Sequence, residues 1–138
     1  MILLDTSGLL AALDVSQDWH PQAAASLADA APPRLLSPFV LAELDYLLAI
    51  RVGETARTSL LREVERGAYT LAPMSAADVG LAEAVIERHA DLGISLADAS
   101  IVVLAARHGL VDVLTLDQRH FRVLNNRGKP FRVLPADA

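Results

Sequence analysis

The stretch Ile2-Leu3-Leu4-Asp5-Thr6-Ser7, at the start of the chain, decides the fold class. Three consecutive aliphatic residues that end on a carboxylate are typical of a short buried strand in a parallel sheet. Thr6 or Ser7 can then cap a helix, which we expect to run to Leu13. In open parallel sheets, ligands bind outside the carboxyl ends of the strands. Asp5 therefore stands where a ligand site is expected.

Strands and helices alternate along the rest of the chain. Further short strands are expected at 35–36, 69–71, 113–116 and 131–134. Helices are expected from 20 to about 32, from 38 to about 53, over 54–66, from 75 to about 90, and over 95–109. This alternation predicts an α/β fold, a three-layer α/β/α sandwich around a mostly parallel sheet of about five strands. Because no linker or repeat interrupts the pattern, we expect residues 1–138 to form one domain.

The composition excludes several classes of protein. Hydrophobic residues make up 53% of the 138 residues, but no apolar run reaches the roughly 18 residues that a membrane span needs. The absence of cysteine excludes disulfides, zinc sites built from thiolates and a cysteine nucleophile. Because no basic segment precedes the first apolar residues, we expect no secretory signal and predict a cytoplasmic protein.

The charge alone does not decide for or against a nucleic-acid partner. The net charge is −5, from 12 basic and 17 acidic residues, whereas phosphate binding depends on Lys and Arg. Five basic residues nevertheless lie in the last twenty positions: Arg119, Arg122, Arg127, Lys129 and Arg132. This stretch is a candidate phosphate track, and ordinary surface charge is an equally good interpretation.

Four acidic residues stand where the local pattern favours something else. Asp5 and Asp117 each follow a predicted strand. Glu43 interrupts an apolar stripe of the helix that begins at residue 38, and Asp98 begins a helix that is apolar nearly all round. Each acid on a strand end can instead cap a helix, and Asp98 fits a capping box with Ser95. Taken singly, these structural interpretations are at least as good as functional ones.

Taken together, the four acids favour a metal site. If two strand ends and two helices bring them to one pocket, their repulsion would destabilise the fold unless cations neutralise it. Oxygen ligands without His or Cys select Mg²⁺ or Mn²⁺, which can activate water and stabilise the leaving oxygen of a phosphodiester. Without these acids the net charge would be −5 + 4 = −1, which is compatible with a polyanionic substrate.

The remaining polar residues of interest do not indicate a second site. His20, His89 and His108 lack the spacing of zinc ligands. His120 could contact a substrate, although a lone histidine is more often structural. Asp45 follows Glu43 by two residues and so lies on another side of the helix. We interpret Asp45 as structural or interfacial.

The chain resembles the PIN-domain ribonucleases, and among them the VapC-type toxins of toxin–antitoxin pairs. The resemblance covers essentially the whole chain. It rests on four motifs in order: Ile2-Leu3-Leu4-Asp5-Thr6-Ser7, Ser37-Pro38-Phe39-Val40-Leu41-Ala42-Glu43-Leu44, Leu96-Ala97-Asp98-Ala99 and Leu114-Thr115-Leu116-Asp117-Gln118-Arg119-His120-Phe121. Each motif is loose alone, whereas the four in this order are fairly specific, and none of the family's acids is missing.

The resemblance implies a role for each acid and a cofactor. Asp5 and Asp98 would be the principal metal ligands, and Glu43 and Asp117 would complete the site directly or through water. The implied cofactor is Mg²⁺, with Mn²⁺ as a possible substitute. The residues expected to add hydroxyl contacts are Thr6, Ser7 and Thr115.

The resemblance also implies an activity and partners. The activity would be endonucleolytic cleavage of RNA of the tRNA or rRNA class, with Arg119 and Arg122 as candidate RNA contacts beyond Asp117. Family members commonly form homodimers and are inhibited by a small antitoxin that lays an apolar helix in a groove. The helix over 38–52 is apolar on more than one face, which suits burial in its own core or against another chain.

Several alternative functions fit these residues less well. One alternative is a stand-alone RNA-processing PIN nuclease without an antitoxin. A gene for a small DNA-binding protein directly upstream would indicate a toxin instead. A non-catalytic interaction module would have no need of all four acids. A receiver-like phospho-switch needs an acid at the end of the strand over 69–71, and this segment has none. A haloacid-dehalogenase-type phosphatase needs an acid at position 7, which is occupied by Ser7.

Overall fold

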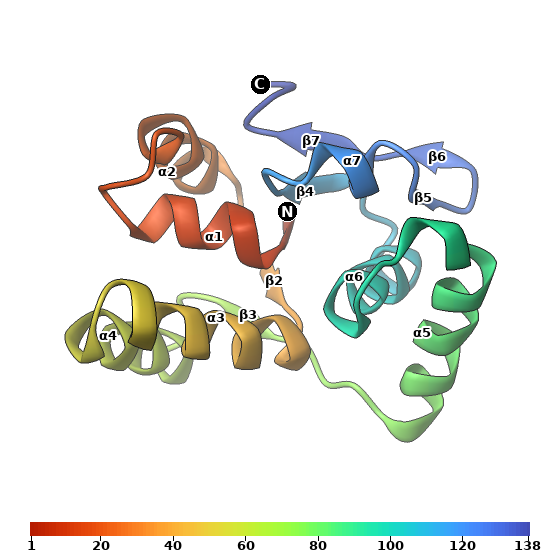
Figure 1. The fold of residues 1–138 in the computed structure, drawn as a ribbon, viewed down its shortest axis with the longest axis horizontal. Coiled ribbons are helices and arrows are strands. Elements are labelled where there is room, and N and C mark those ends of the chain that lie inside the picture. The colour runs from red at the N-terminus through yellow and green to blue at the C-terminus, as the bar shows by residue number, and fades with distance from the viewer.

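The computed structural model describes residues 1–138, the whole of the given chain. Five parallel strands form its central sheet in the order β3-β2-β1-β4-β7 (Figure 1). These strands are β1 (Ile2–Leu4), β2 (Arg34–Leu36), β3 (Thr70–Leu71), β4 (Asp112–Leu114) and β7 (Arg132–Leu134). The α/β class and the five-stranded parallel sheet are confirmed.

Seven α-helices surround the sheet. They are α1 (Thr6–Leu13), α2 (His20–Asp29), α3 (Pro38–Arg51), α4 (Glu54–Glu65), α5 (Ala76–Arg88), α6 (Leu96–His108) and α7 (Gln118–Phe121), with a short 3-10 helix η1 (Ala90–Leu92) after α5. Helices α1 and α2 pack together on one side, and α5 and α6 pack together on the other (Figure 1). Helix α3 contacts both α1 and α6. This is the predicted three-layer arrangement.

Strand β1 lies in the middle of the sheet, and its side chains are buried on both faces. Leu3 is in register with Leu35 of β2 and with Val113 of β4. All three residues of β1 are at most 1% exposed and belong to a core of 33 buried hydrophobic residues. Burial of one such side chain contributes roughly 1.5–3 kcal/mol. A run of three aliphatic residues therefore suits the central position.

Helix α1 packs against β4 at its closest point through a glycine. A Cβ added to Gly8 would lie 2.3 Å from the carbonyl oxygen of Leu114, which is far inside van der Waals contact. Only glycine allows the helix backbone to approach the strand this closely. The approach brings the residues just before Gly8 next to those just after Leu114.

The start of α1 differs from the prediction. Asp5, and neither Thr6 nor Ser7, occupies its N-cap position, and the Asp5 side chain makes no capping hydrogen bond. Thr6 and Ser7 lie inside the first turn. The expectation that Thr6 or Ser7 is the cap is therefore wrong. Asp5 occupies the cap position, as its structural interpretation predicted, but its carboxylate makes no capping hydrogen bond and is available for other contacts.

Element boundaries moved by a few residues, and one small element was not predicted. Helix α2 ends at Asp29, before the expected residue 32. An antiparallel hairpin joins β5 (Asn125–Asn126) to β6 (Lys129–Pro130). Its two turn residues, Arg127 and Gly128, both have positive φ, as the tightest hairpin turns require. None of the helices combines the length and the apolar composition that crossing a membrane requires.

Candidate active site

The candidate site lies where the strand order changes direction. From β1 the chain proceeds to β2 and β3 on one side of the sheet, and from β4 it proceeds to β7 on the other. The crevice outside the carboxyl ends of the strands at such a point is the usual ligand site of open α/β sheets. Asp5 follows β1 here, and Asp117 follows β4 by three residues. The backbone N–H of Asp5 donates to the carbonyl of Leu114 at 3.0 Å, which holds the two strand ends together.

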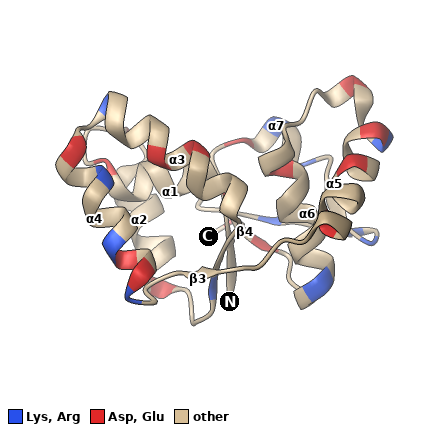
Figure 2. Cartoon of the chain, turned by 90° about the horizontal axis from the view of Figure 1, so that it is seen from below, with Lys and Arg blue, Asp and Glu red and all other residues tan.

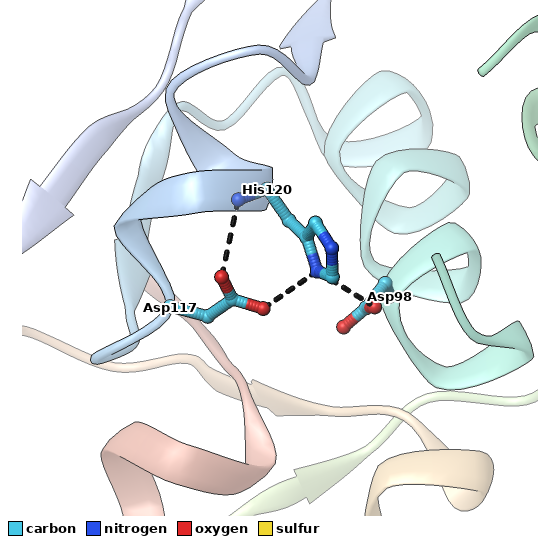
Figure 3. A group of neighbouring side chains, drawn as sticks. All are labelled: Asp98, Asp117 and His120. Atoms are coloured by element: carbon cyan, nitrogen blue, oxygen red, sulfur yellow. Dashed lines mark hydrogen bonds and ion pairs between the residues drawn. The ribbon is translucent and has the colours of Figure 1, made fainter. Parts of the chain in front are cut away.

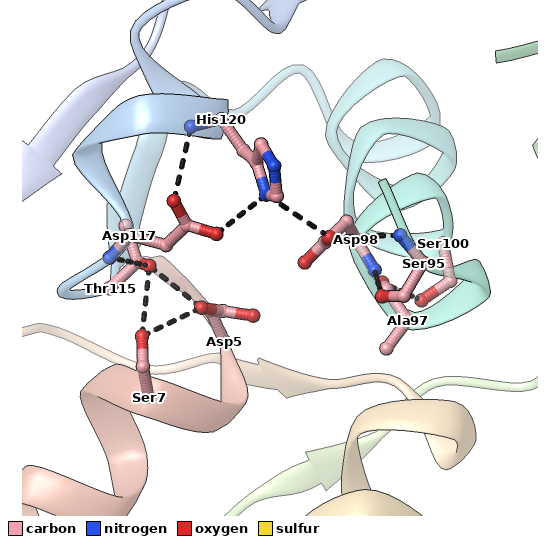
Figure 4. Close-up of polar contacts among 9 residues, drawn as sticks. All are labelled: Asp5, Ser7, Ser95, Ala97, Asp98, Ser100, Thr115, Asp117 and His120. Atoms are coloured by element: carbon pink, nitrogen blue, oxygen red, sulfur yellow. Dashed lines mark hydrogen bonds and ion pairs between the residues drawn. The ribbon is translucent and has the colours of Figure 1, made fainter. Parts of the chain in front are cut away.

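The Asp5 side chain is buried and held by two hydroxyl groups (Figure 4). Its Oδ2 accepts hydrogen bonds from Thr115 Oγ1 at 2.7 Å and from Ser7 Oγ at 2.9 Å. Both hydroxyls donate to the same oxygen, which leaves Oδ1 without a side-chain partner. Burial raises the pKa of Asp5 to about 6, and the nearby charge of Asp98 adds to the rise, whereas the hydrogen bond from Thr115 opposes it.

Asp98, the third residue of α6, takes part in the capping box of that helix and also faces Asp5. The predicted capping box is present: the N–H of Ser95 donates to Asp98 Oδ2 at 3.0 Å, and the N–H of Asp98 donates to Ser95 Oγ at 3.1 Å. The box uses one carboxylate oxygen only, and the other points toward Asp5 (Figure 4). The structural and the functional interpretations of Asp98 are therefore compatible.

Asp117 caps α7 and contacts His120 (Figure 3). Its Oδ1 accepts the N–H of His120 at 3.1 Å, and its Oδ2 lies 2.7 Å from His120 Nδ1. The same ring nitrogen lies 3.6 Å from Asp98 Oδ2, so the imidazole stands between two carboxylates. These distances allow ion pairs, although the angles at the ring nitrogen do not suit a hydrogen bond. One ligand atom of each of the three residues lies within 4.8 Å of the others, a spacing that one metal ion can bridge.

Glu43 reaches the site from the exposed side of α3. The buried stripe of this helix consists of Val40, Leu44 and Leu48, and Glu43 lies beside that stripe and is exposed. Glu43 is thus an exposed acid beside apolar residues of the same helix, of which Val40 is buried and Leu47 packs partly buried against the core. The side chain has no hydrogen-bond or ion-pair partner, and it lines the same cavity as the other acids. A buried hydrogen bond of 2.7 Å between Ser37 and Ser100 joins the start of α3 to α6.

All four predicted acids line one cavity of about 400 Å³. They come from the end of β1, from α3, from α6 and from the segment after β4, and Figure 2 shows acidic positions on both α3 and α6. The ligand atoms on offer are carboxylate and hydroxyl oxygens with a single imidazole and no thiolate, a set that suits Mg²⁺ or Mn²⁺. Thr6 Oγ1 is buried without a hydrogen-bond partner and belongs to a residue of the same cavity. The cavity can therefore hold a divalent metal ion.

The comparisons with known proteins agree with this geometry. Residues 2–125 match the family model of the PIN domain. The chain belongs to the PIN-domain family. It is also 41% identical over 135 residues to Ribonuclease VapC26 of Mycobacterium tuberculosis, a match that covers 97% of this chain and 100% of that relative. The family expected from the four motifs is thus confirmed.

Two solved structures resemble this PIN domain. One is VapC20 of Mycobacterium tuberculosis, described as a toxin that cleaves the sarcin–ricin loop, with a TM-score of 0.79 and 23% identity over 85% of this chain and 90% of that one. The other is FitAcB from Neisseria gonorrhoeae, with a TM-score of 0.62 and 25% identity over 86% of this chain and 88% of that one. The first likeness is a likeness of fold.

The predicted hydroxyl residues of this PIN domain all lie at the site. Ser7 and Thr115 hold Asp5, and their own hydroxyl oxygens are 3.2 Å apart. Thr115 Oγ1 also accepts the backbone N–H of Asp117 at 2.9 Å. Thr115 therefore ties the acid after β1 to the acid after β4.

The predicted basic contacts of the PIN domain differ in their availability. Arg122 makes two hydrogen bonds of 2.7 Å to Asp137, and this pairing lowers the pKa of Asp137 to about 2. Its guanidinium is thus occupied by the C-terminal segment. Arg119 is exposed and forms no ion pair. Asp45 pairs with Arg57 at 2.6 Å and 3.2 Å, which agrees with a structural role for this residue.

Two polar residues of the PIN-domain cavity were not found by sequence reasoning. Arg51, in the last turn of α3, and Gln17, in the loop after α1, both line it. A basic residue at a helix C-terminus is ordinary because it interacts favourably with the helix dipole. A glutamine in a loop carries no pattern at all. No signal in the sequence separated them from surface residues.

Proposed function

We propose that this chain is a Mg²⁺-dependent endoribonuclease that acts as the toxin of a toxin–antitoxin pair. The observation that carries the proposal is the convergence of four carboxylates, from four separate elements, on one cavity. Carboxylates that share one cavity repel one another, which a fold tolerates when a cation is to be bound between them. The 41% identity with a VapC ribonuclease supports RNA as the substrate and an antitoxin as the partner.

We assign metal binding chiefly to Asp5 and Asp98, with Glu43 and Asp117 acting directly or through water. A bound Mg²⁺, or Mn²⁺ in its place, supplies a water nucleophile and neutralises the charge of the phosphate. Thr115 and Ser7 orient Asp5 by their hydrogen bonds to Oδ2. His120 lies beside Asp98 and Asp117, where its ring can contact the substrate.

The finer assignments concern substrate, partners and location. We propose a target of the tRNA or rRNA class, with Arg119 as an RNA contact and Arg122 as a weaker candidate because Asp137 occupies it. We propose that an antitoxin helix covers the outer side of α3, where Tyr46 and Ile50 are 64% and 61% exposed. A homodimer, a cytoplasmic location and action as a single domain over residues 1–138 complete the proposal.

The first test compares two aspartates in the same local setting. Asp98 and Asp78 are both the third residue of a helix and both form a capping box with a serine, but only Asp98 lines the cavity. We expect Asp98→Asn to lower Mg²⁺-dependent RNA cleavage by at least roughly 100-fold, since even residues behind the ligands of a metal site cost 10–100-fold. Asp78→Asn should retain cleavage, with at most a modest loss of stability. Cleavage is followed on total RNA, with and without EDTA.

Full activity of the Asp98→Asn protein, or cleavage that persists in EDTA, would contradict the proposal. Sequencing of the cleaved RNA ends identifies the target in the same samples. A growth assay distinguishes a stand-alone nuclease from a toxin. A toxin stops growth when it is induced alone and is neutralised by the product of a small gene beside it, whereas a processing enzyme needs no such neutralisation.

A further inference from the structure

The cavity extends beyond the four acids along α3. Glu43 and Arg51, both in this helix, line it, and Leu47 lies between them on the same side. Eight residues of α-helix span about 12 Å, so Arg51 is well separated from Glu43 along the helix axis. Gln17 and Leu10 line the cavity from α1 and the loop that follows. The cavity thus holds an arginine, a glutamine and three leucines besides the acids, and the arginine lies about two turns of α3 from Glu43.

Arg51 differs from the other residues that line the cavity because it is a strong base whose guanidinium forms no ion pair. It is the only lysine or arginine among them. It is exposed and forms no ion pair. The arginines that do form ion pairs in the structure are all others. Its guanidinium is therefore available to a ligand that enters the cavity.

We propose that Arg51 binds a phosphate of the RNA strand that neighbours the phosphate being cleaved. The inference rests on the proposed ribonuclease function. The cleaved phosphate must lie among the acids and their metal, but the acids repel the next phosphates of the strand. Arg51 is the position along the cavity where a second phosphate meets a positive charge, and a guanidinium binds phosphate through two parallel hydrogen bonds.

The uncharged residues of the cavity suit the uncharged part of a nucleotide, and Leu47 lies between Glu43 and Arg51 along α3. Leu10 and Leu47 present apolar surface to a sugar or a base, and Gln17 offers both a donor and an acceptor. A strand laid along the cavity would therefore place phosphate, nucleoside and phosphate against acids, leucines and arginine in turn. Arg51 would then select the direction in which the strand leaves the acids.

The experiment measures binding and its dependence on salt. The probe is a fluorescein-labelled single-stranded RNA of mixed sequence, bound to the protein with Ca²⁺ in place of Mg²⁺ and followed by fluorescence anisotropy as KCl is raised. We expect Arg51→Ala to weaken binding roughly tenfold at low salt. The slope of log affinity against log salt should fall in magnitude by roughly 0.7, the value for one lost phosphate contact on a single strand. Arg51→Lys should keep the slope but bind more weakly than the wild type.

The matched control is Arg66→Ala, which removes another exposed arginine without an ion pair near the end of a helix, α4, outside this cavity. It should bind RNA like the wild type. Equal behaviour of Arg51→Ala and the wild type, or an equal loss in both alanine variants, overturns the inference. Mg²⁺-dependent cleavage by the wild-type protein is measured in parallel, because its failure would overturn the proposed function as well, whereas its success with an unchanged Arg51→Ala overturns this inference alone.

Discussion

Asp5 is a carboxylate that the fold holds almost completely out of water, at 4% exposure. Two hydroxyl donors and one N-cap position keep it in place, yet burial still raises its pKa to about 6. A residue chosen for stability alone would be neutral at this position. A carboxylate buried at this cost fits the metal-binding role that we propose for Asp5.

The raised pKa of Asp5 predicts how the metal-free protein responds to pH. The native state holds this proton more tightly than the unfolded chain, whose reference pKa is 3.8. The stability from Asp5 is therefore fully present below that value and is lost as the pH rises through about 6. The loss amounts to about 2–3 kcal/mol at neutral pH. In EDTA at neutral pH, we expect Asp5→Asn to be more stable than the wild type by an amount of that order, and to lose this advantage in acid.

Urea unfolding at the two pH values measures the difference. Asp91→Asn, which changes an exposed aspartate with no partner, serves as the control and should follow the wild type at both. An Asp5→Asn protein whose stability changes with pH in parallel with the wild type would show that folding leaves the pKa of Asp5 unchanged, which contradicts this prediction.

At the scale of elements, the site depends on how closely α1 approaches β4. Ser7 lies in α1 and Thr115 follows β4, and both must reach the same oxygen of Asp5. Gly8 makes this possible because its missing Cβ would meet the Leu114 carbonyl. The hydrogen bond between Ser37 and Ser100 has the same effect for α3 and α6, which carry Glu43 and Asp98.

Two glycine substitutions test the packing of α1 on β4. Gly8→Ala should destabilise the protein by about 1–3 kcal/mol or more, since the new methyl group overlaps a backbone carbonyl that cannot rotate away. Gly80→Ala changes a helical glycine of α5 with nothing within 4 Å of the added Cβ, and should stabilise by up to about 1 kcal/mol. Thermal unfolding gives both values. Equal effects of the two substitutions would mean that α1 can move away from β4 at little cost.

For the whole molecule, a divalent ion bound among the acids would add to the stability of the native state. Four carboxylates line one cavity, and Arg51 with His120 supplies the only basic side chains there. An ion that binds the native state alone shifts the unfolding equilibrium in proportion to the logarithm of its concentration. Under the proposed assignment, metal binding would keep Asp5 ionised, which should remove the loss of stability with rising pH.

Metal titration of the melting temperature tests this dependence. At about 100 times its dissociation constant, Mg²⁺ should stabilise the wild type by roughly 2.7 kcal/mol. For a chain of this length the melting temperature should then rise by roughly 5–10 °C. Asp98→Asn should lose most of the shift, and Asp78→Asn should keep it. An unchanged melting temperature across Mg²⁺ and Mn²⁺ concentrations that support cleavage would count against a metal bound by these acids.

Much of the fold was predictable because its signals are local. A run of three aliphatic residues specifies a buried strand, and Ser95 with Asp98 specifies a helix start, wherever they lie in the chain. The β5–β6 hairpin escaped prediction because its strands are two residues each, too short for any periodicity. The N-cap of α1 escaped because Asp5, Thr6 and Ser7 are all good caps, and only contacts with β4 distinguish them.

By itself, the sequence determined the α/β class, the order of the elements and the identity of the four acids, since each follows from residues that are neighbours in the chain. Tertiary structure decided which distant residues meet: Thr115 beside Asp5, Asp137 on Arg122, and Arg51 in the cavity of the acids. These contacts depend on how strands pair and how closely helices pack. When two partners are 100 or more residues apart in the chain, the residues adjacent to one of them do not indicate the other.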